Sequence, residues 1–553
     1  MLVVGRRLFA AVMGPRGSTS LFLLVLLNLN LLCVSGGNIL VWPAEFSHWL
    51  NVKVILDLLI ERGHNVTVVT HTATPSVRTS PSPGYNVEIL QVPHTKQDIL
   101  ENMEKMLKYW THELPNVNFI KASMKIKEMI DIGTEQNQAV CNALFAREDL
   151  LEKWRKEKFD ALLADPVFMC GELLAQKLNL PLILSLRFSF GNTIERLCAQ
   201  LPAPPSYVPA IGSENTDQMN FLQRLKNVLF YGTQDVLLYL VTKSKWDHLY
   251  TEILGKPTTM CETMGKADIW LIRTYWDFEY PRPLLPNFKF VGGLHCKPAK
   301  PLSKELEKFV QSSGDHGVVV FSLGSMINNL TMERANTVAS ALGQIPQKVL
   351  WRYSGKTPET LAPNTKLYDW MPQNDLLGHP KTKVFITHGG TNGLYEAIYH
   401  GVPMVGLPLF ADQPDNMMHM KTKGAAVVLD INTMESKDLA DALKTVLNNL
   451  SYKESIMRLS RIHHDQPMKP LDQAVFWIEF VMRNKGAKHL RVQAHDLSWY
   501  QYHCLDVLAF LLSIVALITF LFIKTCSFFF RKCFRKTRPD GKAQKSVKKN
   551  KKE

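Results

Sequence analysis

Residues 384–416 constrain the fold of this chain more than any other stretch. An apolar run at 384–387 leads into His388-Gly389-Gly390, and a second apolar run at 403–410 leads into Asp412-Gln413, with a helix-like segment between them. This order predicts strand, loop, helix, strand and loop, one unit of a parallel α/β sheet. Because ligands bind at the carboxyl ends of the strands in such sheets, both polar clusters are predicted to face one binding site.

The side chains at these two strand ends fit a phosphorylated sugar. Gly389 and Gly390 let a backbone approach closely, and the start of the following helix offers free N–H groups to an anion. His388 adds a hydrogen-bond donor, and three further side chains suit the hydroxyls of a sugar or ribose: Glu396, Asp412 and Gln413. The alternative is an ordinary glycine turn with these polar residues at the surface, which would leave the converging groups without a use.

A longer series of residues resembles the donor-binding signature of UDP-glycosyltransferases: Trp370, Gln373, His388-Gly389-Gly390, Asn392, Glu396, His400-Gly401, Pro403, Pro408 and Asp412-Gln413. The resemblance extends from Asn38 to the basic tail. Residues 42–70 and 486–507 resemble the vertebrate UDP-glucuronosyltransferases, particularly their second family. The resemblance implies an α/β chain of GT-B architecture, with two doubly wound Rossmann-like domains facing a cleft and one C-terminal transmembrane helix.

The resemblance also implies roles at the donor site. Trp370 is expected to stack on the uracil, with Gln373 beside it. Glu396 is expected to bind the ribose, and Asp412 and Gln413 the transferred sugar. The phosphates are expected to meet His388, Gly389, Gly390 and Asn392. Ser322 and Ser325 lie at a predicted strand end, where they meet the phosphates or form a serine-rich turn. Arg273 aligns with an arginine suited to the carboxylate of a glucuronyl donor, the alternative being a surface ion pair.

Transfer of a sugar to a hydroxyl needs a base for the hydroxyl proton and stabilisation of the leaving diphosphate. His48 follows the first predicted strand, and Asp165 follows another strand of the same domain. A carboxylate beside an imidazole fixes its tautomer and stabilises the imidazolium. The resemblance supports His48 as general base and Asp165 as its partner; the residues alone also allow a polar helix start and a helix cap. No Asp-x-Asp pair is present, so neither a metal nor a cofactor is expected besides the co-substrate UDP-glucuronate.

The chain is expected to act as an inverting, metal-independent UDP-glucuronosyltransferase on small lipophilic acceptors. UDP-glucose, UDP-galactose or UDP-N-acetylglucosamine are the alternative donors. A non-catalytic membrane protein that binds sugar nucleotide or lipid is the alternative from another class. Intact His48 and Asp165 beside an intact donor signature argue against it.

Strand-like and helix-like runs predict two α/β series along the chain. The first has strands at 38–43, 65–70 and 159–164 with helices at 48–62 and 171–178, and the second has strands at 317–322, 349–353, 384–387, 404–408 and 425–431. Residues 218–256 predict amphipathic helices that pack on the first domain, cover an apolar pocket or touch the bilayer. The expected divisions are an acceptor-binding domain at 37–291, a linker at 292–302, a UDP-sugar-binding domain at 303–460 and helices at 461–500 that, by the resemblance, return to the first domain.

Two apolar segments predict the topology. Residues 1–36 have a basic start, an apolar run and small residues near a cleavage site, which is typical of a signal peptide. Residues 501–523 are expected to span the membrane, and the basic tail 524–553 to stay in the cytosol. The net charge of +14 is concentrated in that tail, so nucleic acid is not an expected partner. The expected protein is a single-pass type I protein of the endoplasmic reticulum membrane with a lumenal body, and homo- or hetero-oligomers are compatible with it.

Cysteines and glycosylation sequons fit a lumenal body. Six cysteines would be lumenal, none in a close pair, so a zinc or redox motif is not indicated and any disulfide partners are unreadable: Cys141, Cys170, Cys198, Cys261, Cys296 and Cys504. Three asparagines begin glycosylation sequons. Asn329 is the best candidate because it lies in a predicted loop, Asn449 is a second, and Asn65 is expected to be buried in a strand.

Overall fold

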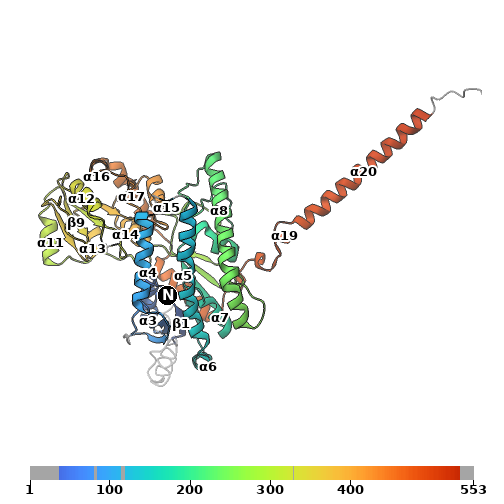
Figure 1. Ribbon diagram of the computed structural model, residues 1–553, viewed down its shortest axis with the longest axis horizontal. Coiled ribbons are helices and arrows are strands. Elements are labelled where there is room, and N and C mark those ends of the chain that lie inside the picture. Colours follow the sequence, from blue (N-terminus) through green and yellow to red (C-terminus); the bar gives the residue numbers. More distant parts are fainter. Residues whose placement is uncertain (1–35, 80–83, 114–116, 118, 328, 536–553) are drawn as a thin grey trace, which may run out of the picture. The chain divides into compact units, whose positions relative to one another are not determined.

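The computed structural model describes residues 36–79, 84–113, 117, 119–327 and 329–535 (Figure 1). The predicted signal peptide, apart from residue 36, and residues 536–553 of the tail lie outside the described residues. The chain divides into two compact units, Met1–Val492 and Gln493–Glu553.

The first domain is built around a parallel sheet with the order β3-β2-β1-β4-β5-β6-β7. Its strands are β1 (Asn38–Trp42), β2 (Asn65–His71), β3 (Asn86–Leu90), β4 (Ala161–Ala164), β5 (Leu182–Leu186), β6 (Ile269–Ile272) and β7 (Phe288–Phe290). Its main helices are α3 (Ser47–Glu61), α4 (Lys96–Lys108), α5 (Phe119–Phe145), α6 (Glu148–Glu157), α7 (Gly171–Leu178), α8 (Phe221–Val241), α9 (Asp247–Leu254) and α10 (Met260–Met264).

Both faces of this sheet are covered, which explains why its strands are apolar throughout. Side chains alternate between the faces along β1, so Leu40 and Trp42 belong to one core and Ile39 and Val41 to the other. Helices α5, α6, α7 and α10 pack on the first face. Helix α3 packs on the second face, together with α18 (Pro470–Asn484) from near the end of the chain.

The second domain is built around a parallel sheet with the order β10-β9-β8-β11-β12-β13. Its strands are β8 (Val318–Ser322), β9 (Lys348–Arg352), β10 (Thr365–Tyr368), β11 (Thr382–Thr387), β12 (Met404–Gly406) and β13 (Ala426–Val428). Its helices are α11 (Lys304–Gln311), α12 (Met332–Leu342), α13 (Gln373–Leu377), α14 (Thr391–His400), α15 (Gln413–Thr422), α16 (Ser436–Asn448) and α17 (Leu450–His464) (Figure 1). The prediction of two doubly wound α/β domains is confirmed.

The chain passes between the domains twice. It first leaves β7 and reaches α11 through the loop at 292–303. It returns after α17, which packs on α14 and α16 of the second domain, while α18 contacts α3, β4 and β6 of the first. The crossing therefore takes place at 465–469. As a result, the first domain is completed by a segment that follows the second domain in sequence.

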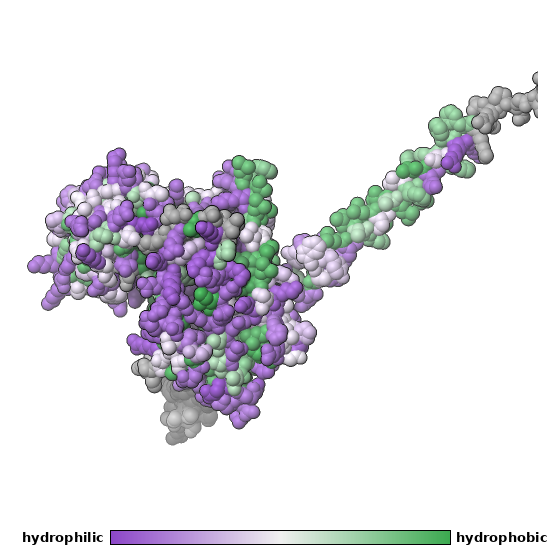
Figure 2. Space-filling model, viewed as in Figure 1, coloured by the Kyte–Doolittle hydropathy of each residue, from purple (hydrophilic) through white to green (hydrophobic). Residues whose placement is uncertain are grey.

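Helix α8 has an apolar side that the described part of the chain leaves uncovered. Tyr231 and Asn227 are buried, but a row of large apolar side chains is exposed: Phe221, Leu222, Leu225, Val228, Leu229, Val236 and Leu240. Figure 2 shows them as a hydrophobic column along the helix. Packing on the first domain thus accounts for only part of this amphipathic segment.

The second unit contains α19 (Trp499–Tyr502) and α20 (Leu505–Arg535). Helix α20 is long and apolar enough to cross a membrane. The helix begins at Leu505 and continues through the first basic residues to Arg535, so it contains most of the predicted span of 501–523, which stays a prediction. Lysine and arginine have good helix propensity, so the end of the apolar run does not end the helix.

Two disulfides lie in the first domain. Cys141 of α5 is bonded to Cys170 before α7, and Cys198 is bonded to Cys261 of α10. Their sequence separations of 29 and 63 residues explain why spacing did not reveal the pairs. The sequon residue Asn65 is exposed, so its predicted burial was wrong: it is the first residue of β2 and lies outside the buried part of the strand. Asn329 and Asn449 are also exposed.

Candidate active site

The carboxyl ends of both sheets border one cavity of about 800 Å³. The first domain contributes the loop after β1, the start of α3 and residues of α4, α5 and the loop after β4. The second domain contributes the loops after β8, β10, β11 and β12 and the start of α14. Asn51 of α3 donates from Nδ2 to Oδ1 of Asn392 in α14 at 3.0 Å, so the helices that border the cavity touch across the domain boundary.

His48 and Asp165 meet on the first-domain side. Nδ1 of His48 lies 2.6 Å from Oδ2 of Asp165, whose side chain is fully buried, whereas that of His48 is 30% exposed. Burial alone would raise the pKa of Asp165, but His48 and Arg273 outweigh it and hold the pKa below its ordinary value. A buried carboxylate attracts an imidazole N–H, so we assign the proton to Nδ1. Nε2, which has no hydrogen-bond partner among the described residues, is then a free base.

The backbone around this pair is held in place by hydrogen bonds. The N–H of Val167 donates to Oδ1 of Asp165 at 3.1 Å, which orients the carboxylate. Phe46, two residues before His48, has a φ of 55°. Its N–H donates to Oγ of Ser76 at 2.8 Å, and Ser76 in turn contacts Glu45. A strained non-glycine residue beside a functional side chain is typical of active sites.

Arg273 joins the pair in a way that the sequence did not predict. Nη1 lies 3.2 Å from Oδ2 of Asp165, and Nη2 lies 2.9 Å from Nδ1 of His48. Because we assign a proton to Nδ1, this nitrogen cannot accept a hydrogen bond from the guanidinium. Arg273 therefore donates to Asp165. Arg273 also lines the cavity. Its expected contact with the carboxylate of a donor sugar stays a prediction, but the protein already provides this cation with one carboxylate.

The phosphate end of the site surrounds the start of α14. Gly390 is the N-cap residue, and Thr391 and Asn392 follow it at the cavity. Burial lowers the pKa of His388 to about 4, so its imidazole is neutral and can offer a hydrogen bond but no charge. The free N–H groups of the helix start provide the positive potential for a diphosphate.

Gly389 is the exception among the predicted donor residues. It does not line the cavity, so its predicted direct role in donor binding is not supported by the geometry. Its φ of +87° and the closeness of an added Cβ to Met417 at 2.7 Å explain why glycine is needed there. Gly389 therefore shapes the loop on which His388 and Gly390 stand.

The nucleoside end is formed by α13, α14 and the loop after β10. Trp370 is 72% exposed, a position in which an aromatic face is free for a base. Nε2 of Gln373 donates to Oε2 of Glu396 at 2.6 Å. Burial raises the pKa of Glu396 to about 7, although Gln373 opposes this shift. Ser322 and Ser325 line the same cavity, with Ser322 accepting from the N–H of Gly324 at 3.2 Å.

The sugar end is formed by the start of α15. Oδ2 of Asp412 accepts from Nδ2 of Asn416 at 2.8 Å and from Oγ1 of Thr391 at 3.3 Å. Oε1 of Gln413 accepts from the N–H groups of Leu409 and Phe410 at 3.0 and 3.2 Å. The amide oxygen of Gln413 is thus committed to the loop, and its NH₂ is the group left for a ligand.

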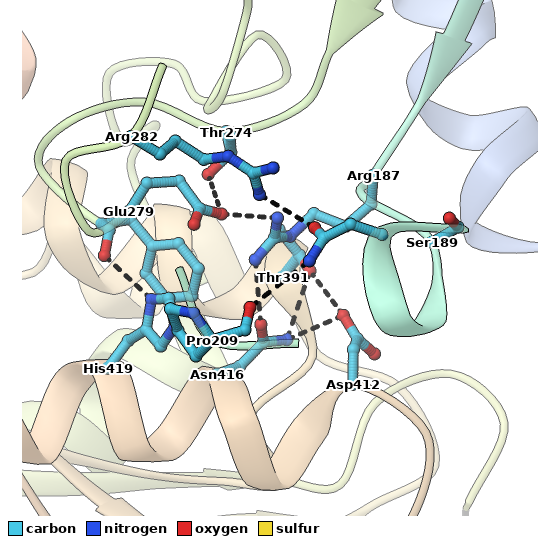
Figure 3. Close-up of polar contacts among 12 residues, drawn as sticks. Arg187, Ser189, Pro209, Thr274, Glu279, Arg282, Thr391, Asp412, Asn416 and His419 are labelled. Atoms are coloured by element: carbon cyan, nitrogen blue, oxygen red, sulfur yellow. Dashed lines mark hydrogen bonds and ion pairs between the residues drawn. The ribbon is translucent and has the colours of Figure 1, made fainter. Parts of the chain in front are cut away.

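Two partly buried arginines near the sugar end were missed by the sequence analysis. Figure 3 shows Arg187 between Glu279 and the start of α15. Arg187 lies 2.5 Å from Glu279, donates to Oδ1 of Asn416 at 3.3 Å and lines the cavity. Arg282 donates to Oδ1 of Asn192 at 2.9 Å and lies near Thr274 and Glu279 (Figure 3). The signal for Arg187 was its place directly after β5, a strand that the periodicity did not predict.

The second domain contributes another missed cation. Arg352 ends β9, contacts the carbonyl of Gly324 and lines the cavity. No group of three or more His, Cys, Asp or Glu side chains within the described ranges is arranged to hold a metal ion.

The family to which these features point is decided by comparison with known proteins. A family model described as "UDP-glucoronosyl and UDP-glucosyl transferase" matches residues 37–539. The chain belongs to this family. UDP-glucuronosyltransferase 2A1 of Mus musculus is 60% identical to it over 519 residues, 92% of this chain and 97% of the relative. UDP-glucuronosyltransferase 2B17 of Homo sapiens is 57% identical over 526 residues, 95% and 98% of the two chains.

Solved structures agree with this family at the level of the fold. CalG4, the calicheamicin glycosyltransferase, has a TM-score of 0.52 and 18% identity, covering 81% of this chain and 98% of its own. Os79 from O. sativa in complex with U2F and trichothecene has a TM-score of 0.55 and 15% identity, covering 80% and 100%. The predicted GT-B architecture of this glycosyltransferase family member is confirmed.

Proposed function

We propose that this chain transfers glucuronic acid from UDP-glucuronate to a hydroxyl of a small lipophilic acceptor, with inversion at the anomeric carbon. The observation that carries the proposal is the His48–Asp165 pair at a cavity that is also lined by the donor residues of the second domain. The names of relatives that are 56–60% identical support glucuronate as the transferred sugar.

In the proposed reaction Nε2 of His48 takes the acceptor hydroxyl proton while the oxygen attacks the anomeric carbon. Asp165 stabilises the imidazolium that forms. The bond between the anomeric carbon and the diphosphate oxygen breaks, and UDP leaves from the opposite face of the sugar. The helix start at Gly390–Asn392 and the neutral donor His388 stabilise the developing charge on the diphosphate.

The donor contacts divide along the cavity. Trp370 and Gln373 bind the uracil, and Glu396 binds the ribose. Asp412 and Gln413 bind the sugar hydroxyls. The phosphates are bound by Ser322, Ser325, His388, Gly390 and Asn392. UDP-glucose, UDP-galactose and UDP-N-acetylglucosamine are the competing donors. A non-catalytic sugar-nucleotide-binding or lipid-binding membrane protein is the competing class, which an intact His48–Asp165 pair disfavours.

The test is an assay of the full-length protein in membranes with radiolabelled UDP-sugars and a panel of phenols and steroids. We expect transfer from UDP-glucuronate; preferred use of UDP-glucose would replace the donor, and no transfer from any donor would remove the enzymatic proposal. Arg273→Gln separates its two roles. A larger loss with UDP-glucuronate than with UDP-glucose assigns it to the donor carboxylate, and an equal loss assigns it to the Asp165 pair.

We further propose that the body lies in the lumen of the endoplasmic reticulum, anchored by α20 as a type I span. The two disulfides and the basic residues after the apolar run support this orientation. Protease added to sealed microsomes should trim only the tail. Digestion of the body from outside would reverse the topology.

A further inference from the structure

One end of the cavity has polar atoms that neither the proposed base nor the donor contacts use. His71 is the last residue of β2, and His94 lies in the loop between β3 and α4. Both line the cavity, and their rings are 5.9 Å apart. Nδ1 of His71 and Nε2 of His94 are buried without a hydrogen-bond partner among the described residues.

The hydrogen-bonding state of His71 follows from its surroundings. Burial, followed by the neighbouring His94, lowers its pKa to about 4, so the ring is neutral. Nε2 lies 3.7 Å from Oε1 of Glu45, and that carboxylate is held by Oγ1 of Thr74 at 2.7 Å and the N–H of Ser76 at 3.1 Å. This separation is too long for a hydrogen bond, but the negative charge of the carboxylate favours the tautomer whose N–H points toward it, so we assign the proton to Nε2. Nδ1 is then left as an acceptor in a part of the cavity that apolar side chains line together with Glu45, Gln136 and Asn137.

The wall around these two imidazoles suits a flat lipophilic body. Phe168 stacks on His71 with ring centroids 5.9 Å apart. Side chains of α4, α5 and the loop after β4 complete this end of the cavity: Ile99, Met106, Val140 and Val167. A buried nitrogen without a partner costs free energy, which a ligand hydroxyl placed against it recovers.

The sheet sets the separation between this end and Asp165, the residue that contacts the proposed base. Strands β2 and β4 flank β1, with Val41 aligned to Val68 and Trp42 aligned to Ala164. Their ends, which carry His71 and Asp165, are therefore two strand spacings apart, roughly 10 Å.

We propose that His71, with His94 beside it, is an acceptor-anchoring site for a second hydroxyl, so that the acceptors are rigid lipophilic diols with oxygens at opposite ends. This rests on the proposed function in one respect, since the other hydroxyl is the one placed at His48.

The test compares 4-phenylphenol with 4,4′-dihydroxybiphenyl, whose second oxygen lies at about the required span. Equilibrium binding to the full-length protein in membranes, with UDP present, is measured first, because it does not depend on transfer. We expect the diol to bind about 5-fold to 10-fold more tightly than the mono-phenol. His71→Phe should abolish that ratio, and His71→Asn, which keeps an acceptor near the position of Nδ1, should retain most of it. His248→Phe, at an exposed histidine of α9, is the matched control.

Equal binding of the two biphenyls to the unmodified protein, or an unchanged ratio in His71→Phe, would overturn the anchoring site. If His71→Phe does not fold, the unmodified protein still decides, since 2,4′-dihydroxybiphenyl should lose the preference that the 4,4′ isomer shows. Transfer is then measured with UDP-glucuronate. A binding preference without any transfer would contradict the proposed function alone, and transfer to both phenols without a binding preference would contradict the anchoring site alone.

Discussion

At the scale of single residues, the fully buried Asp165 is central to the proposed reaction although solvent does not reach it. It contacts His48 and Arg273 and accepts the N–H of Val167, yet it does not line the cavity. Its contribution is therefore to orient the imidazole and to stabilise its protonated form, without touching a substrate.

Asp165→Asn should lower turnover of an aliphatic alcohol by about 10³-fold, because the amide can no longer stabilise the imidazolium or select its tautomer. An acidic phenol needs less base and should lose less. UDP affinity should not change. Turnover with both acceptors and the Kd for UDP are the measurements, with Asp57→Asn on the exposed side of α3 as control. Equal losses for both acceptors would make Asp165 a purely structural residue.

The raised pKa of Glu396 should make the stability of the protein and its affinity for UDP depend on pH. Its pKa rises to about 7 in the folded protein, against an ordinary 4.5. Because the carboxyl binds its proton more tightly in the folded state, the free energy of unfolding falls as pH rises from about 4.5 to about 7. Above pH 7 this decrease stays constant, at most about 3 kcal/mol. The unliganded Glu396→Gln protein should therefore melt higher than the unmodified protein above pH 7, with a difference that fades toward pH 5.

UDP binding should move in the opposite direction. Ribose hydroxyls donate to the ionised carboxylate, so the affinity of the unmodified protein should rise from pH 6 to pH 8, and that of Glu396→Gln should be weaker and flat. Thermal melting and UDP titration over this range check both statements. Glu333→Gln, at an exposed position of α12, is the control. A pH-independent affinity in the unmodified protein would contradict the ribose contact.

Sequence patterns and the resemblance predicted most of the candidate residues that line the cavity and the pairing of His48 with Asp165, but not the place of Arg273 beside that pair. Strand-end position and the family resemblance located His48, His388 and Asp412, because a parallel sheet brings its strand ends to one edge. Contacts such as Arg273 with Asp165 join residues 108 positions apart, so no local pattern reports them. Arg187 was missed because the apolar run Leu182–Leu186 before it was not recognised as a strand.

At the scale of elements, the turn between β11 and α14 depends on close approach of its backbone to His388. A Cβ added at Gly390 would lie 2.4 Å from Nε2 of the His388 ring. The helix start and the imidazole therefore occupy adjoining space with no room for a methyl group.

Gly390→Ala should displace the His388 ring and weaken UDP binding by about 10-fold, roughly the cost of one lost hydrogen bond to a charged group. Gly232→Ala in α8 is the matched control, because no atom lies within 4 Å of the added Cβ and a helix-interior alanine is preferred to glycine. UDP titration and thermal melting distinguish the two. Unchanged UDP affinity in Gly390→Ala would show that the ring does not contact the phosphates.

Element prediction succeeded where the apolar runs were long. Strands such as β1 and β11, with the helices after them, were located to within a few residues. The half-buried β10 and the three-residue β7 were missed, since their runs are too short or too polar to stand out. Their places are set by pairing with β9 and β6, which is tertiary information.

At the scale of the whole molecule, α18 joins the end of the body to its beginning. Five of its side chains are buried in the core shared with α3 and the first sheet: Ala474, Val475, Ile478, Val481 and Met482. Fully burying side chains of this size stabilises a fold by about 1.5–3 kcal/mol each for the larger ones. The total is comparable with the net stability of a domain, about 5–15 kcal/mol.

A chain truncated after Val492 should therefore fold, whereas one truncated after Asp465 should not. Both lack α20, so loss of the anchor is common to them and cannot explain a difference. Recovery of secreted protein and resistance to limited proteolysis are the measurements. Equal recovery of the two chains would mean that α18 is not needed for the first domain to fold.

The position of α18 near the end of the chain also delays completion of the first domain during synthesis. The first domain emerges from the ribosome early, yet the face of its sheet on which α3 packs stays only partly covered until residues 470–484 have been made. The last strand of that sheet ends at Phe290 and α18 begins at Pro470, so at typical elongation rates the roughly 180 residues between them take about 10–40 s. During that interval the apolar side chains of α3 and the sheet that α18 later covers stay exposed. The first domain to be made is thus the last to be completed.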